Sequence, residues 1–310
     1  MSTKVLLFTA YYFPGYKGGG PIKSIKNIVD LTGDDYEFGI VTGDRDLGDE
    51  VKYRGIEINK WSAVGKANVL YVRAEYLTIL NLIKIIKETP CDVIYLNSFF
   101  DVNYSTKVLL ARRFGFLNGN MRIILAPRGE FSPGALKIKS FKKRLFIFTL
   151  KLSGLYNDIL WQATSQLEKQ DIINTLGVEE KSVLIVKNLP SKDEVFSEVK
   201  TDHVHVSDTL KIVFLSRISP KKNLDYALKV LQKVTVQVDF NIYGPKEDPE
   251  YWCACKKLIE MLPDNVNANY CGTARPSEVS KIFEKHSIFF FPASISVLAS
   301  IFLLISISYN

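Results

Sequence analysis

Two cations lie five residues apart just after an apolar run in the second half of the chain. The run Lys211-IVFLS predicts a buried strand, and Arg217 and Lys222 follow it on a loop. A helix is expected to begin beyond them, capped by Asn223. An arginine can bind a phosphate through two parallel hydrogen bonds, whereas a lysine acts as a compact point charge. The pair could therefore hold a diphosphate. A solvated basic loop is a plausible alternative for Lys221 but a weaker one for Arg217, which directly follows the apolar strand.

A glycine-rich loop follows the first predicted strand, Lys4-VLLFTA. Gly18, Gly19 and Gly20 come in sequence before a proline that suits the first position of a helix. Such a loop would present backbone N–H groups and the positive end of the helix dipole to an anion. The spacing matches neither a P-loop nor a dinucleotide-binding fingerprint. An anion-binding loop and a flexible surface turn both stay open.

The elements that would position these loops follow from the hydrophobic pattern, in which apolar runs of strand length alternate with segments of helical period. The predicted strands are residues 4–10, 91–97, 122–127, 159–165, 182–188, 211–216, 238–244, 266–272 and 288–291. The predicted helices cover residues 22–29, 75–88, 165–175, 249–262 and 276–285, with a further helix from 223. The helix of residues 165–175 is expected to open with a capping box, in which Ser165 is the cap and Glu168 follows three residues later. Strands that alternate with helices indicate parallel sheets, so the chain is predicted to be α/β with two Rossmann-like domains.

A polar, irregular stretch, residues 188–208, divides the two halves and is interpreted as a linker. It separates a first domain of residues 1–187 from a second, incomplete domain of residues 209–292. An aberrant, uncharged tail of residues 293–310 follows. In sheets of this kind ligands bind at the carboxyl ends of the strands, where the glycine loop and the two cations are expected to lie.

The net charge of +7 is unevenly distributed along the 310 residues. Residues 1–187 hold 26 Lys and Arg against 19 Asp and Glu, whereas residues 188–310 hold 14 of each. The excess therefore lies in the first half and indicates an anionic ligand or surface there. No aromatic-rich RNA-binding signature accompanies the basic residues, so a nucleic-acid partner is not expected.

Metal-ligating residues are few and scattered. The pairs Cys253/Cys255 and His203/His205 each lack a second ligand pair nearby, so no metal is implied. The four cysteines suit a reducing cytoplasm, and no N-terminal signal peptide is visible. The sequence therefore predicts a cytoplasmic protein without a metal site.

The segment Ser216-RISPKKN is similar to the Gly/Ser-Arg-x4-Lys signature of family 4 glycosyltransferases, which have the two-domain GT-B fold. Further segments fall in the order of that family: the Gly-Gly-Gly-Pro loop, Ala126-PRGEFSPGAL, Trp161-QATSQLEKQDI, Ile242-YGP, Tyr270-CG and Phe289-FFP. The resemblance extends from residue 4 to residue 292. It is a resemblance to enzymes that build bacterial surface polysaccharides.

The resemblance implies a role for each of the cations and glycines described above. Arg217 and Lys222 would hold the diphosphate of a nucleotide-sugar donor and neutralise the leaving nucleotide. Gly18, Gly19 and Gly20 would let the backbone of the first domain approach the same diphosphate. The donor is a co-substrate, so the resemblance implies neither a metal nor another cofactor.

The resemblance also implies residues for the nucleotide base and for the acceptor. Tyr243, Gly244 and Gly272, at strand ends of the second domain, would line the base pocket. Arg128 and Glu130, in the loop after a strand of the first domain, are candidates for contacts to a glycan or lipid-linked acceptor. For Glu130 a surface carboxylate is the simpler alternative.

The chemistry that the resemblance implies is transfer of a hexose with retention of anomeric configuration. In a front-face displacement the leaving phosphate helps to deprotonate the acceptor hydroxyl. Catalysis then consists mainly of positioning and of electrostatic stabilisation of the departing nucleoside diphosphate. No dedicated general base is required, and His286, just before an apolar run, is interpreted as structural.

One segment combines positive charge with an apolar helical period. Residues 136–152 hold six basic residues and no acid, and their large apolar residues recur at steps of three and four. Such a helix could lie on an anionic membrane with its apolar face down, peripheral on the inner face of the plasma membrane. A core helix with a solvated basic face is an equally good interpretation.

The uncharged tail lacks what the family places there. Family members continue from the Phe-Phe-Pro strand into a loop with Glu and Gly and a helix whose two glutamates contact the donor. Residues 293–310 contain neither Glu nor Gly, and their composition is typical of an AT-rich gene translated out of frame. We therefore expect a frameshifted, truncated transferase with little activity. A membrane anchor is the alternative, although five serines make it poor beside the ~20 apolar residues of a span.

Three other interpretations compete with a glycosyltransferase. The first is a catalytically inactive, truncated relic of the same fold. The second is a different nucleotide-dependent Rossmann enzyme, against which the missing Gly-x-Gly-x-x-Gly after the first strand counts. The third is a basic module that binds membranes or RNA.

Overall fold

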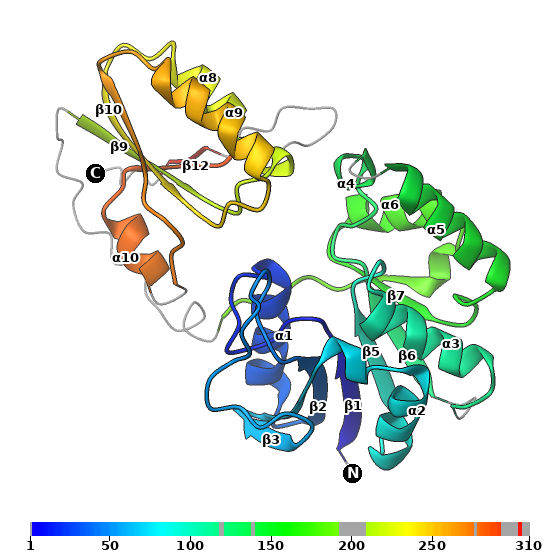
Figure 1. Cartoon of the computed structure of the whole chain (residues 1–310). Coiled ribbons are helices and arrows are strands. Elements are labelled where there is room, and N and C mark those ends of the chain that lie inside the picture. Colours follow the sequence, from blue (N-terminus) through cyan, green and yellow to red (C-terminus); the bar gives the residue numbers. More distant parts are fainter. Residues whose placement is uncertain are drawn as a thin grey trace. The chain divides into compact units, whose positions relative to one another are not determined.

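The computed structural model describes residues 2–117, 121–137, 140–191, 209–275, 278–292 and 303–305. It divides into two compact units, unit 1 from Met1 to Ser197 and unit 2 from Glu198 to Asn310 (Figure 1). Each unit has its own mainly parallel sheet and its own helices, so the chain is α/β with two Rossmann-like domains, as predicted. Residues 192–208, most of the predicted linker, lie outside the described residues.

Unit 1 contains an eight-stranded sheet in the order β3-β4-β2-β1-β5-β6-β7-β8. Its strands are β1 (Thr3–Phe8), β2 (Tyr36–Gly43), β3 (Trp61–Val64), β4 (Ala67–Val72), β5 (Val93–Asn97), β6 (Arg122–Ala126), β7 (Leu160–Ala163) and β8 (Val183–Ile185). Neighbouring strands are parallel except for β3 and β4. Along β1, Leu6 and Phe8 enter one hydrophobic cluster and Leu7 another, so both faces of this central strand are covered.

The helices of unit 1 form where apolar residues recur at helical spacing. They are α1 (Gly20–Thr32), α2 (Ile79–Glu88), α3 (Lys107–Arg113), α4 (Pro133–Lys137), α5 (Ser140–Ser153) and α6 (Gln166–Leu176), with short turns η1 (Ala74–Tyr76), η2 (Val102–Thr106) and η3 (Glu180–Ser182). The predicted helix of residues 75–88 begins later than expected. The Thr78 side chain accepts a hydrogen bond from the Asn81 amide at 3.2 Å and caps α2, while η1 is a separate turn.

Unit 2 contains a smaller sheet in the order β11-β10-β9-β12-β13. Its strands are β9 (Thr209–Leu215), β10 (Gln237–Tyr243), β11 (Val266–Tyr270), β12 (Ile288–Phe290) and β13 (Leu303–Ile305), and its helices are α8 (Leu224–Leu231), α9 (Pro249–Glu260) and α10 (Val279–Glu284), with the short turn η4 (Pro220–Lys222). β9 to β12 are parallel, and β13 pairs with β12 in the antiparallel direction. Phe214, Phe240 and Leu228 lie in the buried core of this unit.

Some elements differ from the sequence-based predictions. β2, β3, β4 and α3 were not predicted; β2 to β4 lie in a stretch, residues 36–72, whose apolar runs are short and interrupted by glycine and polar residues. Asn223 precedes α8 as expected, but it has a left-handed φ of 61° and its side chain makes no cap hydrogen bond. Its backbone turn, not its side chain, therefore begins the helix.

The uncharged tail was predicted to be an out-of-frame ending or a membrane anchor. Apart from the backbone of β13, residues 293–310 lie outside the described residues. Within the part of the chain that the structure describes, no helix is both long and apolar enough to cross a bilayer.

Candidate functional site

The candidate donor residues of unit 2 lie at one edge of its sheet. Tyr243 is in register with Leu215, and Ile242 with Tyr270, so β9, β10 and β11 end together. Tyr243 is the last residue of β10, and the loops that follow the three strands carry the other four predicted donor residues of this unit: Arg217, Lys222, Gly244 and Gly272. Because these loops leave the carboxyl ends of parallel strands, they occupy the edge at which such sheets bind ligands.

Gly244 holds two of these loops together. Its φ is 148°, and a Cβ atom placed on it would meet the carbonyl oxygen of Ser216 at 1.8 Å. Its amide donates a hydrogen bond to the carbonyl of Gly272 at 2.8 Å, while the Ser216 amide donates to the Tyr243 carbonyl at 3.0 Å. Only glycine fits at this position, so the backbone of the β10 loop can approach the loop that carries Arg217.

Arg217 is held by an acid that the sequence analysis did not single out. Its Nη1 donates to Oε1 of Glu247 at 2.8 Å, and both side chains are more than a third exposed. An exposed pair of this kind contributes only about 0–1 kcal/mol, so an anionic ligand can compete with Glu247 for the guanidinium. The loop after β10 thereby orients Arg217 through a contact that a ligand can break at a small cost in free energy.

Lys222 is a partly buried cation beside other cations. Burial lowers the pKa of its ammonium, and the neighbouring Arg217 and Lys221 lower that pKa further, against a smaller opposing effect of Glu247. Its Nζ lies 5.0 Å from the ring centroid of Phe291, just after β12. A bound anion would favour the charged ammonium form that burial and the neighbouring cations disfavour.

The remaining predicted residues of this edge are Tyr243, the last residue of β10, and Gly272, which follows β11. Burial raises the pKa of the Tyr243 phenol, and a hydrogen bond with Cys271 adds to the effect. Gly272 has a φ of 85° and no atom within 4 Å of the place where a Cβ would stand. The Tyr270 hydroxyl donates to the Gly244 carbonyl at 3.0 Å, and Lys246 lies over the Tyr270 ring at 4.0 Å. Tyr270 thus packs behind the Gly244 loop.

In unit 1 the loop after β6 is fixed by its own polar side chains. Arg128 has a φ of 56°, which is unusual for a residue other than glycine. Its guanidinium donates from Nε to Asn97 at 2.8 Å, from Nη2 to the Tyr95 hydroxyl at 2.9 Å and from Nη1 to Asn188 at 2.8 Å. Arg128 therefore ties the end of β5 to the start of the predicted linker.

Glu130 does not stand free on the surface, so the simpler alternative of a surface carboxylate is wrong. Its Oε1 accepts a hydrogen bond from the Ser98 hydroxyl at 2.6 Å, and its Oε2 accepts from the amides of Phe99 at 2.6 Å and Phe100 at 3.3 Å. Burial raises the pKa of this carboxyl, and the three hydrogen bonds oppose that rise. Glu130 thus joins the loop after β6 to the loop after β5.

Glu168 is a third polar residue of this network, and the sequence analysis assigned it only to a capping box with Ser165. The first half of that prediction is confirmed: Ser165 Oγ accepts from the Glu168 amide at 3.1 Å. The carboxylate does not turn back to the Ser165 amide, as a capping box requires. Its Oε1 accepts a hydrogen bond from the Gly129 amide at 2.7 Å, and its Oε2 accepts hydrogen bonds from the Thr164 amide at 2.8 Å and the Thr164 hydroxyl at 2.6 Å. Glu168 therefore joins the loops after β6 and β7.

The glycine loop of unit 1 lies between β1 and α1. Asp46 accepts hydrogen bonds from the amides of Tyr16 at 2.7 Å and Lys17 at 3.0 Å, which fixes the loop just before the glycines. Gly19 is the first residue before α1, with a φ of 71° and no side-chain cap. No atom lies within 4 Å of a Cβ placed on Gly19 or Gly20, whereas on Gly18 a Cβ would meet the Ile22 side chain at 2.9 Å. The helix N-terminus is thus uncapped by a side chain and sterically open.

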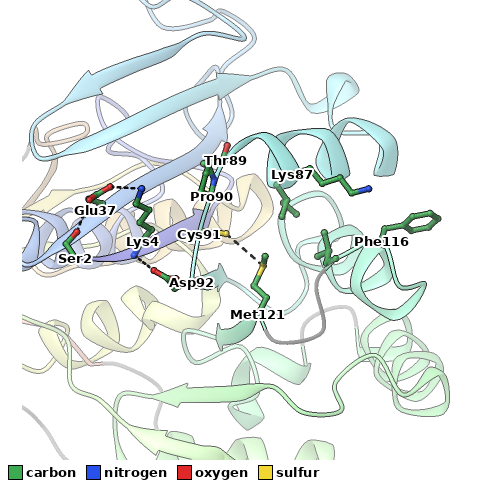
Figure 2. A pocket seen from close by; sticks show the side chains of 12 residues that line it. Ser2, Lys4, Glu37, Lys87, Thr89, Pro90, Cys91, Asp92, Phe116 and Met121 are labelled. Carbon is green, nitrogen blue, oxygen red and sulfur yellow. Dashed lines mark hydrogen bonds and ion pairs between the residues drawn. The ribbon is translucent and has the colours of Figure 1, made fainter.

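A hollow at the opposite edge of the unit 1 sheet has a different character. It measures about 720 Å³ and is lined from the starts of β1 and β5 (Figure 2). The Lys4 amide donates to Asp92 at 2.8 Å, and burial together with Asp92 raises the pKa of the Cys91 thiol to about 11. A protonated thiol is a poor nucleophile, so this hollow offers no evident chemistry.

Metal ligands do not gather in the part of the chain that the structure describes. Within residues 2–117, 121–137, 140–191, 209–275, 278–292 and 303–305, no group of three or more His, Cys, Asp or Glu side chains could hold a metal ion. Cys253 is exposed and Cys255 is buried. The other candidate pair, His203 and His205, lies outside the described residues.

Comparison with known proteins found similar structures but no similar sequence. No protein-family model and no curated protein sequence matches the chain. Among solved structures, HepE from Anabaena in complex with UDP-glucose is 13% identical, with a TM-score of 0.61 over 94% of this chain and 74% of that one. A glycosyltransferase from Rickettsia africae is 14% identical, with a TM-score of 0.57 over 94% and 73%. Trehalose-6-phosphate synthase is 9% identical, with a TM-score of 0.65 over 94% and 78%. These similarities show that the chain has the α/β fold class of GT-B glycosyltransferases.

Proposed function

We propose that the chain is a glycosyltransferase that binds a nucleotide-sugar donor through unit 2. The observation that carries the proposal is the pair of cations at the carboxyl edge of the second sheet, Arg217 and Lys222. Lys222 is partly desolvated and repelled by its neighbours, and Arg217 is held by an exposed acid that an anion can replace. The similarity to HepE, which was solved with UDP-glucose, supports a nucleoside diphosphate as that anion.

In the proposed reaction the two cations act on the leaving group. Arg217 would hold a phosphate through its planar guanidinium, and Lys222 would add a point charge as the sugar–phosphate bond breaks. Tyr243, Gly244 and Gly272 would lie along the base. The transfer of a hexose with retention, by front-face displacement, is part of the proposal because the resemblance to family 4 implies that mechanism.

For unit 1 we propose contacts to the acceptor, a glycan or a lipid-linked sugar of a surface polysaccharide. Arg128 and Glu130 would act there as positioning residues, because their polar atoms already bind the loops after β5 and β6. Gly18, Gly19 and Gly20 would offer backbone N–H groups to an anion. No metal and no other cofactor enters the proposed reaction.

Isothermal titration of the whole chain with UDP, GDP and ADP tests this proposal. We expect one nucleotide to bind, and Arg217→Ala and Lys222→Ala each to weaken binding by roughly 1.5–3 kcal/mol, the contribution of a hydrogen bond to a charged group. Lys257→Ala, on α9, is the matched control and should bind as the wild type does. Equal affinity of all four proteins would refute the assignment of the cations.

Binding and transfer are separate questions, and a second measurement separates them. If the wild type binds a nucleoside diphosphate, release of that diphosphate from the corresponding nucleotide sugar can be followed with and without oligosaccharide acceptors. Acceptor-dependent release supports transfer. Binding without release would instead identify the chain as the inactive relic of the same fold.

A further inference from the structure

The face of α5 that points away from unit 1 is apolar. Its large side chains remain exposed: Phe141 by 79%, Leu145 by 53%, Phe148 by 59% and Leu152 by 73%. These residues follow one another at steps of four, three and four, so at about 100° of rotation per residue they form one row along the helix. We call Phe141, Leu145, Phe148 and Leu152 the apolar row.

The opposite face of α5 already provides the packing against unit 1. Ile147 and Leu150 are buried in the main hydrophobic cluster, and Phe146 packs against it. At the helical rotation these residues lie on the far side of the helix from the apolar row. The apolar row is therefore not part of the core. One face of α5 packs against the core, as the interpretation of a core helix requires, but the outer face carries an apolar row between its exposed cations.

Cations border the apolar row on both sides. The helical rotation puts Arg144 and Lys151 on one flank and Lys142 on the other. Among the described residues, none of these three makes an ion pair with an acid. No Asp or Glu occurs between Glu130 and Asp158, so α5 itself carries positive charge and no negative charge.

A hollow adjoins the flank that carries Arg144 and Lys151. It measures about 750 Å³ and is lined by residues of α4, α5 and α6, which lie on the same side of unit 1 (Figure 1). Lys137, Arg144 and Lys151 line it together with Phe148 of the apolar row, and Asp171 is the one acid in its lining. Apolar surface and phosphate-binding groups therefore meet at Phe148.

We propose that this face of α5 is a docking surface for an anionic lipid bilayer. The apolar row would enter the boundary of the acyl chains, as interfacial helices do to a depth of about 5–10 Å. Lys142, Arg144 and Lys151 would meet the headgroup phosphates on either side. The combination favours a lipid surface over a soluble anion, because an anion alone leaves the apolar row without a partner. This inference stands independently of the proposed glycosyl transfer.

Co-sedimentation of the whole chain with vesicles tests the docking surface. At low salt the wild type should sediment with vesicles of phosphatidylglycerol and phosphatidylcholine, and much less with phosphatidylcholine alone. Each cation near an anionic surface contributes about 1 kcal/mol, so replacing Lys142, Arg144 and Lys151 by Gln should weaken binding about a hundredfold. Replacing Lys52, Lys84 and Lys87 by Gln removes the same charge elsewhere in unit 1 and should change binding much less.

The apolar row has its own variant, in which all four residues become Ser. Because these side chains are exposed, the variant should keep the thermal unfolding midpoint of the wild type. Charge attraction is screened within about 8 Å at 0.15 M salt, whereas apolar contact is not. Added salt should therefore release the Ser variant completely and the wild type only in part. Val51→Ser with Leu80→Ser, two exposed apolar residues outside α5, is the control for lost apolar surface.

Three outcomes would overturn the proposal. The first is that the wild type fails to sediment with anionic vesicles at low salt. The second is that the cation variant sediments as the wild type does. The third is that light scattering finds a dimer, which the Ser variant converts to a monomer. The last outcome would make the apolar row an interface between two copies of the chain. Nucleotide titration does not involve α5, so a failure here leaves the proposed donor site standing.

Discussion

At the scale of single residues, Lys222 has the most informative environment in the proposed donor site. Burial and the nearby Arg217 lower its pKa below the ordinary value of 10.5. A basic group with a lowered pKa costs stability while it is charged in the folded state, and that cost falls as the pH rises from the lowered value to the ordinary one. An anionic ligand reverses the shift, because it stabilises the ammonium form. Binding and protonation of Lys222 should therefore be coupled.

This coupling predicts a pH dependence of nucleotide affinity. Affinity should be constant below the pKa of Lys222 and fall as the pH rises through it, approaching about tenfold per pH unit above it. In Lys222→Arg the guanidinium stays charged at these pH values, so the fall should vanish. Titration calorimetry between pH 7 and 10 measures both. The same decline in the two proteins would show that another group causes it.

Gly244 is a second informative residue, and its role is to allow two loops of unit 2 to approach each other closely. A methyl group at this position would meet the Ser216 carbonyl at 1.8 Å, on a backbone with φ of 148°. We expect Gly244→Ala to destabilise unit 2 by about 3 kcal/mol and to weaken nucleotide binding, since the loop of Arg217 must shift. Urea unfolding followed by Trp252 fluorescence measures the stability.

Gly134→Ala is the matched control for this prediction. Gly134 lies in α4, and no atom stands within 4 Å of a Cβ placed on it. Its substitution should leave stability unchanged or raise it slightly, because alanine favours a helix. If Gly244→Ala is equally harmless, the close approach of the two loops does not exist in solution.

At the scale of elements, unit 1 uses buried or partly buried carboxylates to hold its carboxyl-end loops in place. Glu130 joins the loops after β5 and β6, and Glu168 joins those after β6 and β7. Both accept backbone N–H groups that the ends of the strands leave unpaired. The loop between them, residues 127–132, is thus supported from both sides, which suits a site that must keep its shape without a ligand.

Removal of one support should release that loop. Glu168→Ala loses the hydrogen bonds to Gly129 and Thr164, and bonds to a charged group contribute about 1.5–3 kcal/mol each. We expect unit 1 to lose about 3 kcal/mol in urea unfolding, and the Gly129 amide to exchange faster with deuterium. Ser165→Ala removes only the α6 cap and should cost about 1 kcal/mol. A loss for Glu168→Ala no larger than that of the cap variant would contradict the bridging role.

At the scale of the whole molecule, the two units have separate cores. The clusters of unit 1 extend from Leu6 to Val183, and the cluster of unit 2 from Ile212 to Val266. A ligand that binds the native state of one unit stabilises that unit by mass action, by about 2.7 kcal/mol at a hundred times its dissociation constant.

Nucleotide should therefore raise the unfolding midpoint that Trp252 reports in unit 2. Trp61 and Trp161 lie in unit 1. A variant with Phe at these two positions keeps only the fluorescence of unit 2, and Trp252→Phe keeps only that of unit 1. A shift in unit 2 alone would mean that its own loops hold the ligand, and a shift in both would show that the glycine loop contributes. No shift in unit 2 would contradict the proposed donor site.

The sequence alone determined the α/β class, most strands and the order of the candidate loops. These follow from local patterns: a buried strand such as Lys4-VLLFTA is apolar throughout, and the capping of α6 by Ser165 needs only neighbours three residues away. The place of Arg217 and Lys222 after a strand was likewise fixed by the pattern around them. The pattern did not predict β2 to β4, because their segments lack long apolar runs.

Only the tertiary structure decided how the polar side chains are used. Arg128 contacts Asn97 and Asn188, 31 and 60 residues away, and Glu130 contacts Ser98, 32 residues away. Such contacts depend on which strand ends meet at one edge of the sheet, and no local pattern records that. The same holds for α5, whose period shows two apolar faces. Which face is buried was decided by the packing of Ile147 and Leu150 against the core, and the other remained exposed.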